Sequence, residues 1–343
     1  MRKLRVLMLT HPDLVPPASL KGQSEQDIHT WKTEWDVVST LRRSGHEVLP
    51  LGVQNELAPI REAVEGFKPH VVFNLLEEFH GEAVYDHSVV SYLELLRVPY
   101  TGCNPRGLVL SRGKDVSKKL VHYHRVPTPA FAVFPMGRKV KRPPRLALPL
   151  IVKSVIEDAS MGIAQASVVE TDEALAERVA FIHQRIGTAA IAEQYIDGRE
   201  IYVGVLGNDR RRVLPLWELH FGDLPQGTRP IATEMVKHNL EYQDRHGVTQ
   251  GPAEGLTPQT VTRIHTMVKR ICRTLDLEGY ARIDFRLAPD GTPYFIEANP
   301  NPEIARIEEF ARSAKHDGLD YPDLLNRILA LGLARGRSAG IAG

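Results

Sequence analysis

Two consecutive segments near the C-terminal end carry the residue types best suited to bind a metal ion. The first, over 280–287, reads Tyr-Ala-Arg-Ile-Asp-Phe-Arg-Leu, and the second, over 292–299, reads Thr-Pro-Tyr-Phe-Ile-Glu-Ala-Asn. Charged residues alternate with apolar ones in the first segment, and an Asp-Gly pair at 290–291 separates the two. Such segments on either side of Asp-Gly are the pattern of a β-hairpin. We therefore predict two antiparallel strands whose facing residues can be counted outward from the turn.

Counting outward from a two-residue turn places Asp284 opposite Glu297. The same count places Arg282 opposite Asn299, with all four side chains on one face. Opposed carboxylates with Cβ atoms about 5 Å apart repel each other, and a divalent cation removes that penalty. Oxygen ligands of this kind suit Mg²⁺, or Mn²⁺. Without a metal, Glu297→Gln removes one of the two repelling charges, so we expect this variant to fold at least as stably as the unsubstituted protein. A type I turn with a bulge would shift the register by one residue, and a hairpin with a solvated polar face is the alternative without a metal.

The elements that must position this hairpin begin with an alternating N-terminal half. Apolar runs predict strands, and apolar residues three or four apart predict helices. The strands are expected over 4–10, 46–53, 71–76 and 98–101, and the helices over 23–44, 58–66 and 83–96. This alternation predicts a Rossmann-like, doubly wound parallel α/β domain. The domain lacks GxGxxG, so dinucleotide binding has no support.

The pattern changes after residue 105 to α+β with antiparallel strands. Strands are expected over 148–153, 166–169, 190–196, 200–206 and 213–219, and helices over 112–124, 172–186 and 257–275. The basic, proline-rich stretch 137–145 is predicted to be a solvated loop. The last residues, 335–343, are small and polar and predict a disordered tail.

Composition excludes several classes of protein. The chain has 343 residues, 43% hydrophobic and 25% charged, with a formal net charge of +1. The near-zero charge argues against nucleic acid or an anionic membrane as a partner. Two cysteines make a disulfide framework or a structural zinc site improbable. No run approaches the ~18–20 apolar residues of a membrane span, so we expect a cytoplasmic protein.

Five segments, in order along the chain, resemble the D-alanine–D-alanine ligases of the ATP-grasp superfamily. They are Val98-Pro-Tyr-Thr-Gly102, Ser111-Arg-Gly-Lys114, Leu148-Pro-Leu-Ile-Val-Lys153, Ala192-Glu-Gln-Tyr-Ile-Asp-Gly-Arg-Glu200 and the hairpin with its Glu297-Ala-Asn299. The resemblance implies an ATP-grasp fold with two α+β lobes that clasp ATP. It divides the chain into a pre-ATP-grasp domain over 1–108, a central lobe over 109–192, a C-terminal lobe over 193–335 and a tail over 336–343.

The resemblance also implies a set of site residues. For ATP these are Lys114, Lys153, Ser160, Gly162, Glu193, Tyr195, Ile196 and Glu200, covering phosphates, phosphate loop, adenine hinge and ribose in that order. Two Mg²⁺ ions would bind Asp284, Glu297 and Asn299. Lys237 would reach the transferring phosphate, and Arg282 would stabilise the oxyanion of a tetrahedral intermediate. The implied activity is an acyl-phosphate route from a carboxylate to an amide.

The substrate residues depart from the family pattern. After the first strand, Thr10-His-Pro-Asp-Leu14 replaces the family's Gly-Gly-x-Ser-x-Glu loop. His80 and Asp86 match family positions, whereas Glu303 follows Asn299 where the family has Ser-Pro-Gly. We therefore expect a related carboxylate–amine ligase, a homodimer, acting on another pair of amino acids or short peptides. An ATP-grasp kinase for a small molecule and a non-catalytic nucleotide-binding subunit are the alternatives.

Overall fold

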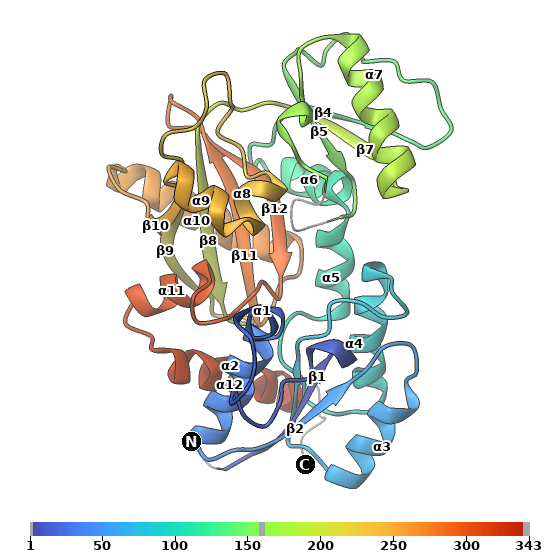
Figure 1. The fold of residues 1–343 in the computed structure, drawn as a ribbon, viewed down its shortest axis with the longest axis vertical. Coiled ribbons are helices and arrows are strands. Elements are labelled where there is room, and N and C mark those ends of the chain that lie inside the picture. The colour runs from blue at the N-terminus through green and yellow to red at the C-terminus, as the bar shows by residue number, and fades with distance from the viewer. Residues whose placement is uncertain (1–2, 158–161, 339–343) are drawn as a thin grey trace.

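The computed structural model describes residues 3–157 and 162–338. Its N-terminal part contains a three-stranded parallel sheet in which β1 (Arg5–Thr10) lies between β2 (Glu47–Gly52) and β3 (Val71–Asn74). This sheet occupies the lower part of Figure 1. The predicted parallel α/β domain is therefore confirmed. The strand expected over 98–101 is reduced to a single bridge between Tyr100 and Val72.

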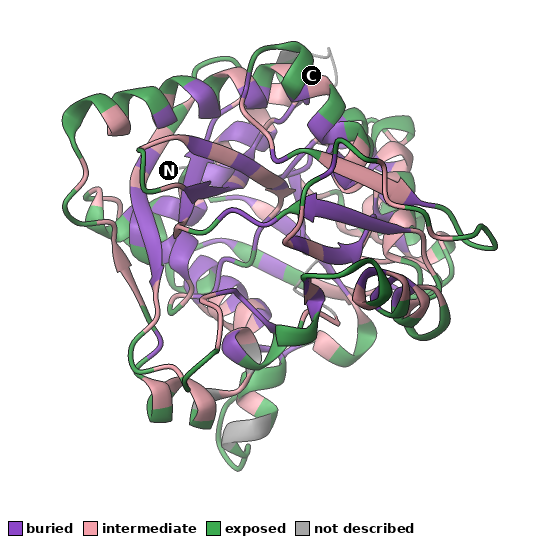
Figure 2. Cartoon of the chain, turned by 90° about the horizontal axis from the view of Figure 1, so that it is seen from above, coloured by how far each residue is buried: buried purple, intermediate pink, exposed green. Residues whose placement is uncertain are grey.

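Both faces of the parallel sheet are covered, as buried parallel strands require. One face packs on α2 (Lys32–Arg43) and on the C-terminal helix α12 (Tyr321–Ser338), with a shared core that includes Val6, Met8, Val38, Leu325 and Leu329. The other face packs on α3 (Ala58–Phe67) and α4 (Asp86–Leu95), with a core that includes Leu7, Leu9, Ile60 and Val90. Figure 2 shows the resulting concentration of buried residues on the strands.

The helix expected over 23–44 is two helices. The first, α1 (Glu25–Thr30), starts at a capping box formed by Ser24 and Asp27, and α2 follows directly. Trp31 separates them with φ −117° and ψ 28°, outside the helical region. Its side chain is buried, so tertiary packing of the indole overrides the continuous periodicity of the sequence. Short 3-10 turns also occur at Pro12–Leu14 and, before α4, at Ala83–Tyr85.

The central lobe is a four-stranded antiparallel sheet with its own core. The order is β4 (Phe131–Phe134), β7 (Ala190–Gln194), β5 (Leu150–Ser154) and β6 (Val168–Val169). Helix α7 (Asp172–Phe181) and a π-helical turn (Ile182–Ile186) cover one face, after a 3-10 turn at Gln165–Ser167. Two helices, α5 (Pro105–Arg112) and α6 (Lys114–Tyr123), precede the lobe, whereas the sequence predicted only the second.

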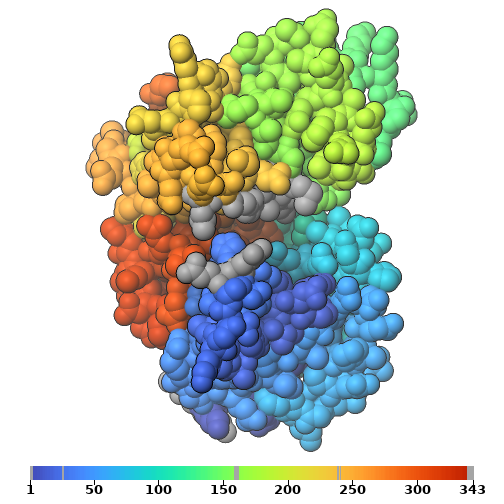
Figure 3. Space-filling view, in the orientation of Figure 1, coloured from blue at the N-terminus to red at the C-terminus, as the bar shows by residue number. Residues whose placement is uncertain are grey.

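The C-terminal lobe is a five-stranded antiparallel sheet. The order is β10 (Thr249–Pro252), β9 (Arg212–His220), β8 (Arg199–Leu206), β11 (Tyr280–Leu287) and β12 (Pro293–Pro300). Helix α10 (Pro258–Thr274) packs on it, and three short helices not predicted from sequence are α8 (Glu234–His238), α9 (Leu240–His246) and α11 (Glu309–His316). In Figure 3 the two lobes form the upper part of the molecule, above the N-terminal residues.

The prediction of a disordered tail over 335–343 is wrong for its first residues. Helix α12 continues to Ser338. Arg335 Nε donates to Glu278 Oε2 at 2.9 Å, and its Nη2 donates to the carbonyl of Gly102 at 2.7 Å. The remaining residues, 339–343, lie outside the described part of the chain. Among the described residues, no helix has the length and apolar character needed to cross a bilayer.

The hairpin of β11 and β12 closes through three residues rather than two. The amide of Ala288 donates to the carbonyl of Thr292 at 3.0 Å, so the turn consists of residues 289–291. Gly291 has φ +80°, a conformation that glycine adopts without steric cost. Next to the turn, the register therefore differs by one residue from the count that a two-residue turn gives.

A bulge in β12 cancels this shift. Phe285 pairs with Phe295, but the next residue of β11, Asp284, pairs with Glu297, so Ile296 is an extra residue. Bulges of this kind re-aim the side chains that follow them. Beyond the bulge both predicted pairs are confirmed, Asp284 with Glu297 and Arg282 with Asn299.

Candidate nucleotide and metal site

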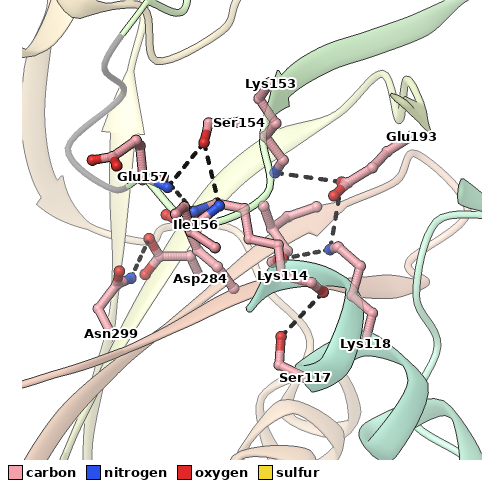
Figure 4. A network of polar contacts seen from close by, with 12 residues as sticks. Lys114, Ser117, Lys118, Lys153, Ser154, Ile156, Glu157, Glu193, Asp284 and Asn299 are labelled. Carbon is pink, nitrogen blue, oxygen red and sulfur yellow. Dashed lines mark hydrogen bonds and ion pairs between the residues drawn. The ribbon is translucent and has the colours of Figure 1, made fainter. Parts of the chain in front are cut away.

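Charged side chains from both lobes and from α6 converge beside the β11–β12 hairpin (Figure 4). Lys114 and Lys118 are four residues apart on α6, so they share one helix face. Lys153 comes from β5 and Glu193 from the neighbouring strand β7. The structure thus brings together residues that are up to 185 positions apart in the sequence, from Lys114 on α6 to Asn299 on β12.

Glu193 lies at the centre of this arrangement and is almost completely buried. Its Oε2 atom is 3.4 Å from the ammonium of Lys118 and 3.4 Å from that of Lys153. Its Oε1 atom has no hydrogen-bond partner among the residues that the structure describes. A buried acceptor without a donor costs free energy, so this oxygen is well suited to receive an N–H group from a ligand. An adenine amino group is such a donor.

The segment after Glu193 is held by an arginine that the sequence analysis did not single out. Arg286 donates from Nε to the carbonyl of Ile196 at 3.2 Å and from Nη1 to Glu200 Oε2 at 3.1 Å. Tyr202 donates to the other oxygen of Glu200 at 2.9 Å. Arg286 follows Asp284 by two residues on β11, so alternation along the strand could have placed it on this face. The expected hinge and ribose residues, Tyr195 included, are therefore packed around one buried guanidinium.

The metal face consists of the two pairs beyond the bulge. Arg282 binds Asp284 with two hydrogen bonds, at 2.8 and 2.9 Å, and Asn299 Nδ2 donates to the same carboxylate at 3.1 Å. Arg282 also binds Glu309, a residue that the sequence analysis missed. Burial raises the pKa of Asp284, and Arg282 opposes that shift. In the described ranges, no group of three or more His, Cys, Asp or Glu side chains is clustered closely enough to hold a metal.

Glu297 faces positive charges as well as Asp284. The ammonium of Lys114 is 3.5 Å from its Oε2 atom and also donates to the carbonyl of Glu157 at 2.6 Å. Burial by itself would raise the pKa of Glu297, but Lys114, Lys153, Lys237 and Arg282 together lower it. The opposed carboxylates are thus compensated by protein cations, which corrects the view that only a metal relieves their repulsion.

Lys118 is fully buried and was not among the predicted site residues. Its ammonium donates to the carbonyls of Phe295, at 3.3 Å, and Ile296. Burial lowers its pKa to about 8, with Lys153 acting in the same direction and Glu193 opposing it. The spacing of Lys114 and Lys118 on one helix was the signal in the sequence that could have identified it.

The phosphate loop and Lys237 complete the expected nucleotide residues. Ser160 lies outside the described residues. Gly162 has φ +68°, and its amide donates to Glu234 at 3.2 Å. Lys237 is in α8, whose first turn is capped by Thr233. Its positive charge contributes to the lowered pKa of Glu297.

Two of the three expected substrate residues, Asp86 and His80, lie in the N-terminal domain and have structural partners. Asp86 is buried and pairs with Arg112 Nη2 at 2.5 Å. Burial raises its pKa, and Arg112 opposes the shift. His80 is exposed with φ +64°, and its amide donates to the carbonyl of Gln54 at 2.6 Å.

The third, Glu303, joins the C-terminal lobe to α2. Its carboxylate is 3.1 Å from the ammonium of Lys32 and accepts a hydrogen bond from Thr33 at 3.1 Å. Lys32 also pairs with Glu308 at 2.6 Å. The negative charge of Glu303 is therefore compensated by Lys32.

Two antiparallel-sheet lobes beside a parallel α/β domain are the architecture of an ATP-grasp protein. The family model described as D-ala D-ala ligase C-terminus matches residues 120–330. An uncharacterised protein of Sinorhizobium fredii is 32% identical over 319 residues, covering 90% of this chain and 89% of that one. The chain belongs to the D-alanine–D-alanine ligase family of ATP-dependent ligases.

Named relatives and solved structures agree with this placement. The D-alanine–D-alanine ligase of Moorella thermoacetica is 28% identical over 323 residues, covering 90% of this chain and 96% of that one. The Bacillus anthracis D-alanine–D-alanine ligase complexed with ATP has a TM-score of 0.74 at 21% identity, over 98% of this chain and 100% of that one. The VanG D-Ala:D-Ser ligase of Enterococcus faecalis has a TM-score of 0.69 at 19% identity, over 96% and 100%. These two likenesses concern the fold.

Proposed function

We propose that this protein is an ATP- and Mg²⁺-dependent ligase that joins a carboxylate to an amine through an acyl-phosphate. The observation that carries the proposal is the placement of Glu193 Oε1 beside the lysines of α6 and β5, since this buried acceptor has no partner within the described ranges. A base-binding acceptor next to phosphate-binding cations is what recognition of a purine nucleoside triphosphate requires.

The residues then divide the reaction between them. Lys114 and Lys153 neutralise phosphate oxygens, and Lys237 does so at the transferring group. Asp284, Glu297 and Asn299 hold Mg²⁺ or Mn²⁺, which supplies charge neutralisation during phosphoryl transfer. These roles combine positioning with electrostatic stabilisation, as phosphoryl transfer demands.

Two bonds are exchanged in the proposed sequence. A carboxylate oxygen of the acid substrate attacks the γ-phosphorus of ATP, and ADP leaves. The amine nitrogen then attacks the carbonyl carbon of the acyl-phosphate, loses a proton and expels phosphate. Arg282, held by Asp284 and Glu309, places a guanidinium beside the metal face, where it stabilises the oxyanion of the tetrahedral intermediate.

We further propose that the substrate pair is not two molecules of D-alanine. The loop after β1 lacks the family's Glu, and the segment after β12 carries Glu303, which is bound to Lys32 instead of being free for a substrate. Both substitutions lie in segments that contact amino acids in the family that the chain resembles. Small amino acids or short peptides with another arrangement of charges fit this difference.

The test is ADP release in the presence of pools of amino acids and dipeptides, followed by mass spectrometry of the products. A condensed product with stoichiometric ADP and phosphate is the expected result. A stable phosphorylated product would instead identify a kinase. ATP binding without turnover of any substrate in the pools would favour a nucleotide-binding subunit.

A further inference from the structure

The bulge in β12 determines which way Glu297 points. Side chains of a regular strand alternate between the two faces of the sheet. If the ladder continued from the turn without a bulge, Ile296 would oppose Asp284, and Glu297 would oppose Ile283. Ile283 is fully buried in the hydrophobic core. The extra residue is therefore what brings Glu297 to the face that carries Asp284.

The main-chain oxygens at this bulge are held by a single side chain. A bulge leaves backbone groups without their ladder partners, and buried groups of this kind need another donor. Lys118 supplies it, because its ammonium donates to the carbonyls of both Phe295 and Ile296. The ammonium also lies 5.4 Å from the centre of the Phe295 ring.

The same ammonium contacts the carboxylate of Glu193 at 3.4 Å. An ammonium has three N–H donors, which matches two carbonyls and one carboxylate. Lys153 shares the same carboxylate oxygen, but its proposed partner during catalysis is a phosphate. Lys118 is then the cation that keeps Glu193 in place when Lys153 turns to the nucleotide.

We propose that Lys118 is a positioning residue that ties the β12 bulge to Glu193, so that one buried cation orients both the metal face and the base-reading carboxylate. The inference rests on the proposed function, because it assigns Glu297 to the metal and Glu193 to the base. It predicts that removing the ammonium weakens two separate recognition events through a residue that touches neither ligand.

The test is calorimetric binding of a non-hydrolysable ATP analogue, with and without Mg²⁺, to the variant Lys118→Met. We expect the gain in affinity that Mg²⁺ provides to fall by about tenfold, the usual scale for loss of a group that orients a metal ligand. We also expect a smaller preference for ATP over inosine triphosphate, which lacks the amino group. The matched control is Lys119→Met, because Lys119 is the adjacent lysine, is 62% exposed and pairs with Asp115.

Loss of a purely structural lysine would lower the melting temperature but leave both the Mg²⁺ gain in affinity and the preference for ATP over inosine triphosphate unchanged. An unaltered Mg²⁺ gain and base preference in Lys118→Met would therefore overturn the inference. If that variant does not fold, Lys118→Gln decides, since it keeps a donor for one carbonyl but has no charge. The Gln variant should lose at least about threefold of the Mg²⁺ gain, roughly half of the effect above on a logarithmic scale, and wild-type behaviour would refute the proposal. Absence of Mg²⁺-dependent nucleotide binding in the wild type would refute the proposed function instead.

Discussion

Replacing Glu297 by glutamine removes one negative charge from the metal face and preserves the shape of the side chain. Two carboxylates opposed on a hairpin repel each other, so the hairpin alone predicts a variant at least as stable as the parent. The structure reverses this sign. The positive charges of four residues lower the pKa of Glu297 despite its burial, namely Lys114, Lys153, Lys237 and Arg282. Removing its charge removes the attraction between Glu297 and these cations.

The size of the effect follows from the nearest of these pairs. The ammonium of Lys114 is 3.5 Å from Glu297 Oε2, and both side chains are largely shielded, at 4% and 17% exposure. At an effective dielectric constant of about 20, unit charges at that separation attract by about 5 kcal/mol. Part of this attraction only offsets desolvation, and removal of one partner from a buried pair costs about 3 kcal/mol. We therefore expect Glu297→Gln to lose about 3 kcal/mol of unfolding free energy without metal.

Urea denaturation, with and without Mg²⁺ and ATP, measures this loss. Wild type should gain stability from the ligands and Glu297→Gln should gain much less, with most ADP release lost. Because the folded pKa of Glu297 is below the unfolded one, its stabilisation is present above the unfolded pKa and is lost as pH falls. The difference between the two proteins should therefore shrink at acidic pH. The control is Glu303→Gln, whose carboxylate is 43% exposed and should cost less than about 1 kcal/mol. Equal urea midpoints and undiminished Mg²⁺ dependence in Glu297→Gln would refute the reasoning.

Three further outcomes can be checked. Lys153→Ala should weaken ATP binding by roughly tenfold or more, the scale of a hydrogen bond between charged groups. The control Lys139→Ala, in the exposed loop, should leave the affinity unchanged. Equal calorimetric affinities of the two variants for ATP would contradict the phosphate role of Lys153. D-alanine alone should be a poor substrate, and efficient formation of its dipeptide at millimolar concentration would remove the proposed difference in substrate. Burial raises the pKa of Glu34, opposed by the hydrogen bond from Thr10, so its charge destabilises the fold above the folded pKa. Glu34→Gln should therefore be more stable than wild type at neutral pH by roughly 1 kcal/mol. This gain should disappear as the pH falls to the pKa that Glu34 has in the unfolded chain. A difference in unfolding free energy that stays constant over this pH range would contradict the prediction.

The hairpin illustrates how a correct prediction can rest on an incomplete reason. A two-residue turn predicts the pair of Asp284 and Glu297, and the pair exists. The actual turn has three residues, and the bulge at Ile296 restores the count. The Asp-Gly pair predicts a turn because turn chemistry is local, but it does not fix the number of residues in that turn. The bulge in β12 is held by Lys118, which is distant in the sequence, so the residues of the strand give no signal for it.

The residues missed by sequence analysis share a physical property. Lys118, Arg286 and Glu309 are charged side chains whose roles depend on partners that lie far away along the chain. Helix or strand alternation gives the face of each residue, but it does not say which element covers that face. Helices α11 and α12 were missed for a related reason, since they belong to a core shared with the N-terminal sheet.

The sequence by itself determined the alternation of elements, the parallel and antiparallel sheets, and the order of the lysine, carboxylate and hinge segments. These features depend on residues close together in the chain, where periodicity and turn chemistry act. Only the tertiary structure decided that Lys118 and Lys153 share Glu193 and that Glu297 is balanced by cations. Those outcomes arise from burial and from charge pairing between distant segments, because electrostatic free energies depend on the surroundings that folding creates.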